Sequence, residues 1–180
     1  MVAQALLFIV DTLFGFLTLA LLLRFYMQVF RVSFNNPVGA FVVQLTNWLV
    51  KPLRKLVPSV LGLDLATLLP AYLLQVLLLV SVFALRGGFE LVAVEPALLL
   101  FLWQAVIATA RISVYLLIGA LVLQAVLSWV NPYSPLAAPL AQLTGPFLAP
   151  LRRVIPPIAN IDLSPLVVIL LAQLVLIFLR

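Results

Sequence analysis

Two carboxylates stand at matching places in this chain, each a short distance after a basic motif. Asp64 follows Pro-Leu-Arg-Lys at 52–55, and Asp162 follows Pro-Leu-Arg-Arg at 150–153. A carboxylate just ahead of an apolar helix can accept hydrogen bonds from its free N–H groups, and the helix dipole favours it there. It can also form an ion pair with a preceding base, and the candidates are Arg54, Lys55, Arg152 and Arg153. Both alternatives are structural, so we expect a helix cap or a clamp at each carboxylate.

Other reactive side chains are scarce. The chain has no cysteine and no histidine, which excludes disulfides, thiolate or imidazole metal sites, cysteine nucleophiles and histidine bases. The sequence also separates Asp64 from Asp162 and places no residue beside either carboxylate that could act with it as a catalytic base. We therefore expect no catalytic residues, no cofactor and no metal, and the chain is predicted not to be an enzyme.

Some polar side chains fall inside very apolar sequence. Gln75 and Gln173 each lie in the middle of such a segment, and an amide in lipid usually finds a hydrogen bond to another helix. We predict that both face the protein interior, bonded to each other or to a neighbouring carbonyl. Asp11 and Arg111 fall at similar depths and are either an ion pair or two solvated ends.

A further polar face is predicted near the end of the first apolar segment. Arg24, Gln28 and Arg31 are spaced i, i+4 and i+7, which puts them on one side of a helix. A similar face in the third apolar segment comprises Gln124, Ser128 and Asn131. The alternatives are an anchoring and packing face at the helix end, or a polar groove for lipid headgroups or a partner helix.

The elements that carry these residues occur twice. Segments 44–65 and 142–163 align without a gap at an offset of 98, and 9 of the 22 pairs are identical. Gln75 and Gln173 have the same offset. This similarity indicates an internal duplication, with a first repeat at 1–88 and a second at 89–180.

The composition of the chain indicates that these repeats lie in a lipid bilayer. The chain is 66% hydrophobic and 8% charged, whereas soluble domains carry about 25% charged residues. We therefore predict an all-α membrane protein with four transmembrane helices. The expected spans are about Ala5–Arg31, Leu65–Leu85, one long helix within Pro96–Val130, and about Ser164–Leu179.

Two spans per repeat return the chain to its starting side, so the two repeats are predicted to be parallel. The basic residues between the spans of each repeat then lie on one face. The excess of Lys and Arg there predicts cytoplasmic basic loops and both termini outside. The net charge of +5 reflects this topology, and we expect no nucleic-acid binding.

The loops themselves, 37–58 and 135–157, are predicted to be unusual. In the first, Gln44, Asn47, Lys51 and Arg54 form one polar stripe on an otherwise apolar helix. Such a segment either lies in the membrane interface or forms a shallow re-entrant hairpin. In the second, Gly145-Pro146 is expected to break the helix and Pro150 to end it. The predicted surface for lipid or a partner consists of Lys51, Arg54, Lys55, Arg152 and Arg153.

The second repeat resembles the YggT family of bacterial and plastid membrane proteins. The resemblance rests on Trp129-Val130-Asn131-Pro132, on 150–157 (Pro-Leu-Arg-Arg-Val-Ile-Pro-Pro) and on 161–165 (Ile-Asp-Leu-Ser-Pro). The first repeat keeps Asn36-Pro37 but has Ala66-Thr67 in place of Ser-Pro. The resemblance implies a membrane factor linked to cell division or shape, to osmotic tolerance, or to maturation of a membrane complex.

Together these observations favour a non-enzymatic scaffold or assembly factor of the bacterial inner membrane. Its expected partners are anionic lipids, an unidentified membrane protein and further copies of itself. The alternative is a small channel or transporter for osmotic or ion homeostasis, formed by oligomers. Ion flux in proteoliposomes favours the channel, and crosslinked protein partners without flux favour the scaffold.

Overall fold

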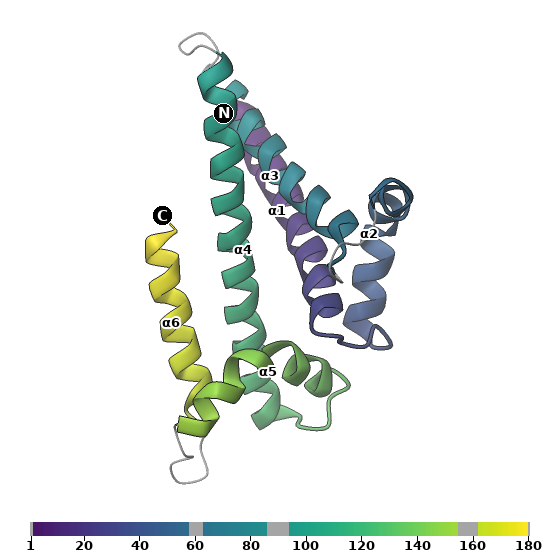
Figure 1. Cartoon of the computed structure of the whole chain (residues 1–180), viewed down its shortest axis with the longest axis vertical. Helices are drawn as coiled ribbons and strands as arrows, with labels where there is room; N and C mark the ends of the chain where they lie inside the picture. Colours follow the sequence, from purple (N-terminus) through teal and green to yellow (C-terminus); the bar gives the residue numbers. More distant parts are fainter. Residues whose placement is uncertain (1, 58–62, 86–93, 155–161, 180) are drawn as a thin grey trace.

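The computed structural model describes residues 2–57, 63–85, 94–154 and 162–179, and its regular structure is helical (Figure 1). The predicted boundary between residues 88 and 89 lies outside the described ranges. Six helices are described, namely α1 (Val2–Val29), α2 (Pro37–Leu56), α3 (Leu65–Leu85), α4 (Val94–Val130), α5 (Ala137–Val154) and α6 (Ser164–Phe178). The order of a long helix, a short basic helix and an apolar helix occurs twice.

Three helices are long and apolar enough to cross a membrane: α1, α3 and α4 over Leu98–Val130. α6 is more apolar than these three but has only 15 residues. At about 1.5 Å per residue it is about 22 Å long, against a hydrocarbon core of about 30 Å. The three long apolar helices indicate a membrane protein, and a fourth span at α6 stays a prediction.

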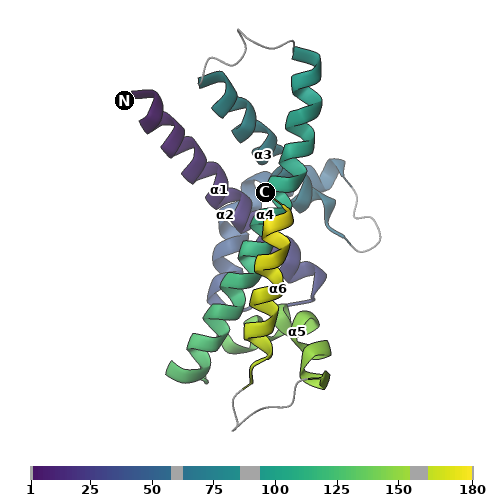
Figure 2. The ribbon, with the colours of Figure 1, turned by 90° about the vertical axis from the view of Figure 1, so that its left-hand side faces the viewer.

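The third apolar segment forms one continuous helix, as its length predicted. α4 has 37 residues and is therefore about 55 Å long. Figure 1 shows α1 and α4 descending in the same direction, while α3 rises beside α1 and α6 rises on the other flank of α4. Figure 2 shows the same helices from the side, with α6 in front of α4.

The tightest packing is between α1 and α3, and α4 contacts both of them less extensively. Leu21 and Leu22 of α1 are buried against Val50 of α2 and Ala66 and Ala71 of α3. Many other large apolar side chains of the long helices are exposed. Apolar side chains that face outward from spanning helices are stable in contact with lipid, because lipid chains are as apolar as leucine.

The turn between α1 and α2 has a fixed geometry. The N–H of Val32 donates to the carbonyl of Met27 (2.7 Å) and that of Arg31 to Gln28 (3.1 Å), the two bonds of a Schellman helix end. Arg31 adopts a positive φ of 54° and is exposed beyond the end of α1. The prediction that it shares a helix face with Arg24 was therefore wrong, because the helix has already ended.

The start of α2 is closely packed. The Asn36 side chain accepts a hydrogen bond from the N–H of Gly39 (2.8 Å), and Pro37 begins the helix, as expected for an N-cap followed by proline. A Cβ on Gly39 would lie 2.7 Å from the backbone of Phe34. Only glycine lets the turn pass this close to the helix.

The helix α5 continues through its prolines. It runs from Ala137 to Val154 with Pro146 and Pro150 inside it, so the predicted break at Gly145-Pro146 and the predicted end at Pro150 were both wrong. An internal proline costs a hydrogen bond and typically kinks a helix, and Figure 1 shows α5 changing direction along its length. Burial of Leu143 and Leu148 against neighbouring helices offsets that cost.

Candidate functional site

The end of α2 and the start of α3 are joined by an ion pair. Arg54 Nε donates to Asp64 Oδ2 at 3.1 Å, and its Nη2 donates to the same oxygen. The hydroxyl of Thr67, one turn into α3, also donates to this oxygen at 2.8 Å. We call these three residues the first clamp. Asp64 thus ties the preceding basic helix to the start of α3.

A second clamp joins α5 to α6 at the matching place. Arg152 Nε donates to Asp162 Oδ2 at 2.8 Å, and Asp162 Oδ1 accepts the N–H of Ser164 at 2.9 Å. Ser164 is the first residue of α6. The carboxylate of Asp162 therefore accepts the first N–H of α6, which has no partner within the helix.

The two clamps differ in exposure. The side chain of Asp64 is 13% exposed and that of Asp162 is 38% exposed. Burial alone would raise the pKa of Asp64, but hydrogen bonds from Arg54, Thr67 and Gln28 and the charge of Arg54 outweigh it and lower the pKa below its ordinary value. For Asp162, burial would also raise the pKa, and the N–H of Ser164 and the guanidinium of Arg152 lower it. Both carboxylates are therefore held in the ionised form.

Arg24 ties α2 to α1 from inside the protein. It is 4% exposed, and its Nη1 donates to Thr46 Oγ1 at 2.7 Å and to Asn47 Oδ1 at 3.1 Å. The hydroxyl of Thr46 in turn donates to the carbonyl of Val42 at 2.6 Å. Gln28, one turn further along α1, supports the carboxylate of Asp64. This face of α1 serves internal contacts between helices.

The second half has a weaker version of this contact. The hydroxyl of Thr144 lies 2.5 Å from Gln124 Oε1 and 2.9 Å from the carbonyl of Leu140. Thr144 is the counterpart of Thr46 at the offset of 98, whereas the counterpart of Arg24 is Val122. An amide on α4 therefore replaces the buried guanidinium, and only the first half places a cation there.

Gln75 and Gln173 have different surroundings. Gln75 is 3% exposed, and its Nε2 donates to Thr18 Oγ1 of α1 at 3.0 Å. Gln173 is exposed on α6. The interior position predicted for both amides is confirmed for Gln75 and wrong for Gln173. Gln75 bonds a hydroxyl and neither Gln173 nor a carbonyl, because α3 packs on α1 while α6 lies on the opposite flank of α4.

The Arg111 guanidinium does not pair with Asp11 within the described residues. Its Nη2 donates to the carbonyl of Leu179 at 2.6 Å, next to the end of α6, where carbonyls lack helical partners. Asp11 is exposed. Arg111 therefore caps a neighbouring helix, a contact that no sequence pattern predicts.

The predicted polar stripe on α2 is split. Val42, Thr46 and Val50 are buried, and Asn47 is drawn inward to Arg24. Exposed side chains on the same helix include Gln44, Lys51, Arg54, Lys55, Phe41 and Trp48. In α5, Arg152 and Arg153 are exposed. All five predicted basic residues therefore face outward at the ends of the two short helices, where two of them also enter the clamps.

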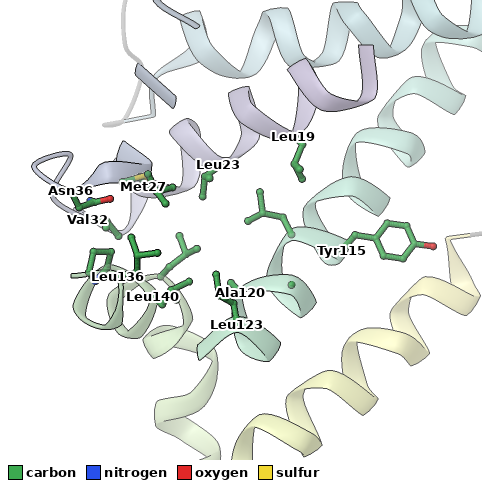
Figure 3. A pocket seen from close by; sticks show the side chains of 15 residues that line it. Leu19, Leu23, Met27, Val32, Asn36, Tyr115, Ala120, Leu123, Leu136 and Leu140 are labelled. Carbon is green, nitrogen blue, oxygen red and sulfur yellow. The ribbon is translucent and has the colours of Figure 1, made fainter. Parts of the chain in front are cut away.

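A hollow of about 330 Å³ lies where α1, α4 and α5 meet (Figure 3). Its lining is almost entirely apolar and includes Leu23, Met27, Leu123 and Leu140, while Asn36 lies at its edge. In Figure 3 the ring of Tyr115 extends away from the hollow. No sequence pattern predicts this hollow, because leucines that line a hollow have the same spacing as leucines that face lipid.

The site thus consists of polar contacts that hold the short helices to the long ones, and of a separate apolar hollow. In the described ranges, no group of three acidic, histidine or cysteine side chains is placed to hold a metal. The residues that sequence reasoning missed are the hydroxyl partners Thr18, Thr46 and Thr67. The recurrence of Thr46 as Thr144 could have pointed to one of them.

Helices that could cross a membrane, with short basic helices tethered at their ends, define a helical membrane protein. The chain belongs to the CCB3/YggT family, whose profile matches residues 3–85 and 103–180. It is 34% identical over 170 residues to the uncharacterized protein YggT of Escherichia coli strain K12, covering 93% of this chain and 85% of that one.

Two further relatives extend the comparison. An uncharacterized protein from the proC 3′ region of Vibrio alginolyticus is 37% identical over 161 residues, which is 89% of this chain and 85% of the relative. An uncharacterized protein of Pseudomonas aeruginosa is 34% identical over 173 residues, 95% and 86% of the two chains. No solved structure matches the chain.

Proposed function

We propose that the protein is a non-enzymatic scaffold or assembly factor of the bacterial inner membrane. In this proposal α1, α3, α4 and α6 cross the membrane as two parallel repeats, with both termini outside. The helices α2 and α5 lie in the cytoplasmic interface. Their basic ends bind anionic lipid and a membrane protein partner.

The observation that carries the proposal is the pair of clamps. Arg54–Asp64 and Arg152–Asp162 each join a short basic helix to the apolar helix that follows it. Because each short helix is held at its C-terminal end, its remaining bases keep a fixed position relative to the long helices. A fixed basic surface suits docking of a partner better than a mobile loop does.

The exposed side chains of α2 and α5 suit a membrane interface. Lys51, Lys55 and Arg153 are exposed, and each basic residue near an anionic surface contributes about 1 kcal/mol of attraction. Trp48 is 65% exposed on α2, and indole rings are enriched at the level of the headgroups. These features support binding of anionic lipid by the two short helices.

Internal contacts occupy the polar groups that an intramembrane enzyme would need free. Asp64 and Asp162 are bonded to arginines, and the Gln75 amide is bonded to Thr18. A general acid or base must reach its substrate with a suitable protonation state. The two clamp carboxylates are instead kept ionised by their partners, which supports a structural role.

Lipid retention in native mass spectrometry tests the proposal. We expect Lys51→Gln with Lys55→Gln to lower the number of retained phosphatidylglycerol molecules relative to wild type. The matched control is Arg86→Gln with Arg180→Gln, which removes the same charge from outside the two short helices and should leave retention unchanged. Equal losses in both double variants would show that lipid retention depends only on net charge, which would contradict binding by the short helices.

Crosslinking in cells tests the protein partner. It should recover a membrane protein partner with the wild type and less of it with Lys51→Gln/Lys55→Gln.

A further inference from the structure

The exposed amide of Gln173 lies within a regular apolar row on α6. Leu166, Leu170, Gln173 and Ile177 are all exposed and are spaced by four, three and four residues. This spacing is that of a coiled-coil seam, and it places the four side chains in one line along the helix. We call these four residues the α6 seam.

The opposite side of α6 is already occupied. Ser164, Val168 and Ala172 are buried, and Val168 packs with Leu121 of α4 and Leu148 of α5. α6 therefore contacts the rest of the chain along one face, while the seam points away from it. In Figure 2 the helix lies at the front of the molecule with its outer side uncovered by other elements.

The first half shows how the equivalent amide is satisfied. Gln75 of α3 donates to Thr18 of α1. At the offset of 98 the counterpart of Thr18 is Leu116, which has no hydrogen-bonding side chain and packs toward α1. The second half therefore lacks the hydroxyl that would hold Gln173 inside, and the amide is left on the outer face.

An amide in the middle of an apolar helix is costly when it faces lipid, and it is relieved by a hydrogen bond to another helix. A primary amide carries both donors and an acceptor. Two copies of Gln173 related by a two-fold axis can therefore each donate to the other. Twofold symmetry also makes the apolar seam residues meet their own counterparts.

We propose that the α6 seam is a homodimer interface, in which two α6 helices pack in parallel about a two-fold axis along the membrane normal and the Gln173 amides bond each other. The inference rests on α6 crossing the membrane, as in the proposed function. One polar residue in an apolar seam also sets the register, because any slip would leave both amides unpaired.

Cysteine crosslinking tests the geometry, because the chain has no native cysteine. Single replacements Leu170→Cys, Gln173→Cys and Ile177→Cys should form disulfide-linked dimers in native membranes under mild oxidation. Val168→Cys and Ala172→Cys, on the face buried by α4 and α5, are the controls and should stay monomeric. Equal crosslinking at both sets of positions, or none at the seam, would overturn the interface.

Dimer affinity tests the role of the amide. In Förster transfer between labelled copies at increasing lipid dilution, Gln173→Leu should raise the dissociation constant about threefold to eightfold, the effect of one or two average membrane hydrogen bonds. Gln75→Leu makes the same change at the equivalent buried position and should leave the dimer affinity unchanged. Equal effects of the two variants would contradict the proposal. Lipid retention by the bases of α2 is a separate readout, so the dimer and the scaffold proposal can fail independently.

Discussion

The two clamps allow a matched comparison within one chain. Asp64→Asn and Asp162→Asn each replace a carboxylate by a neutral group of the same shape. Asparagine keeps an oxygen that can accept from Thr67 in the first case or from the N–H of Ser164 in the second. Each variant therefore removes mainly the charge that binds the arginine.

The expected losses differ because the burial of the carboxylates differs. Asp64 is largely buried and accepts hydrogen bonds from two nitrogens of Arg54, and bonds of this charged kind contribute about 1.5–3 kcal/mol. Asp162 and Arg152 are both substantially exposed, and exposed pairs contribute about 0.2–1 kcal/mol. We expect Asp64→Asn to lower the free energy of unfolding by about 2 kcal/mol and Asp162→Asn by less than about 1 kcal/mol.

Reversible unfolding in mixed micelles of sodium dodecyl sulfate and a mild detergent, followed by circular dichroism, measures both losses. A double-mutant cycle with Arg54→Gln isolates the pair: the loss in the double variant should be clearly smaller than the sum of the two single losses. Equal losses for the two aspartate variants, or additive losses in the cycle, would refute the reasoning that burial sets the strength of the clamp.

The pH dependence has a defined sign. The folded state lowers the pKa of Asp64 and of Asp162, so it binds their protons less tightly than the unfolded chain does. The stability that these groups contribute is present above the unfolded pKa, near 4, and is lost as the pH falls through the lowered folded value. Wild-type stability should drop below about pH 4, and Asp64→Asn should flatten that drop. An identical acid profile in both proteins would contradict the role of Asp64.

Two further predictions concern how α2 is held. Arg24→Met leaves the Asn47 side-chain oxygen without its donor, so α2 should exchange its backbone hydrogens faster and unfolding should become easier by about 1–3 kcal/mol; unchanged exchange in α2 would contradict this. Gly39→Ala places a Cβ against the backbone of Phe34 and should cost about 1–3 kcal/mol, whereas Gly15→Ala, with open space around it, should be neutral or stabilising. Similar melting of the two alanine variants would argue against the close approach at Gly39.

The helical elements were predictable because their signals are local. The helical period that begins at Gln44 and the unbroken apolar run of α4 are read from periodicity and composition alone. The single helix within Pro96–Val130 is confirmed. The separation of Arg54 from Asp64 was informative because it recurs at Arg152 and Asp162, and repetition distinguishes a constraint from chance.

The tertiary contacts were less predictable, because they depend on how the halves differ. Gln75 and Gln173 have equivalent positions in sequence. Thr18 binds Gln75, but the residue at the matching position of the second half is Leu116, which has no hydroxyl. Arg31 continues the spacing of Arg24 and Gln28, but the helix ends before it. Pro146 suggested a break that packing of α5 overrides. A neighbouring helix decided the outcome for Gln173 and Pro146, and the local geometry of the helix end decided it for Arg31.

The central claim is that α2 and α5 both lie at the cytoplasmic face of the inner membrane. Lys55→Cys and Arg153→Cys place single thiols at the exposed ends of the two helices. A membrane-impermeant maleimide should label both in inside-out vesicles and neither in intact spheroplasts. Labelling of the two positions from opposite sides would contradict the parallel arrangement and with it the shared basic surface.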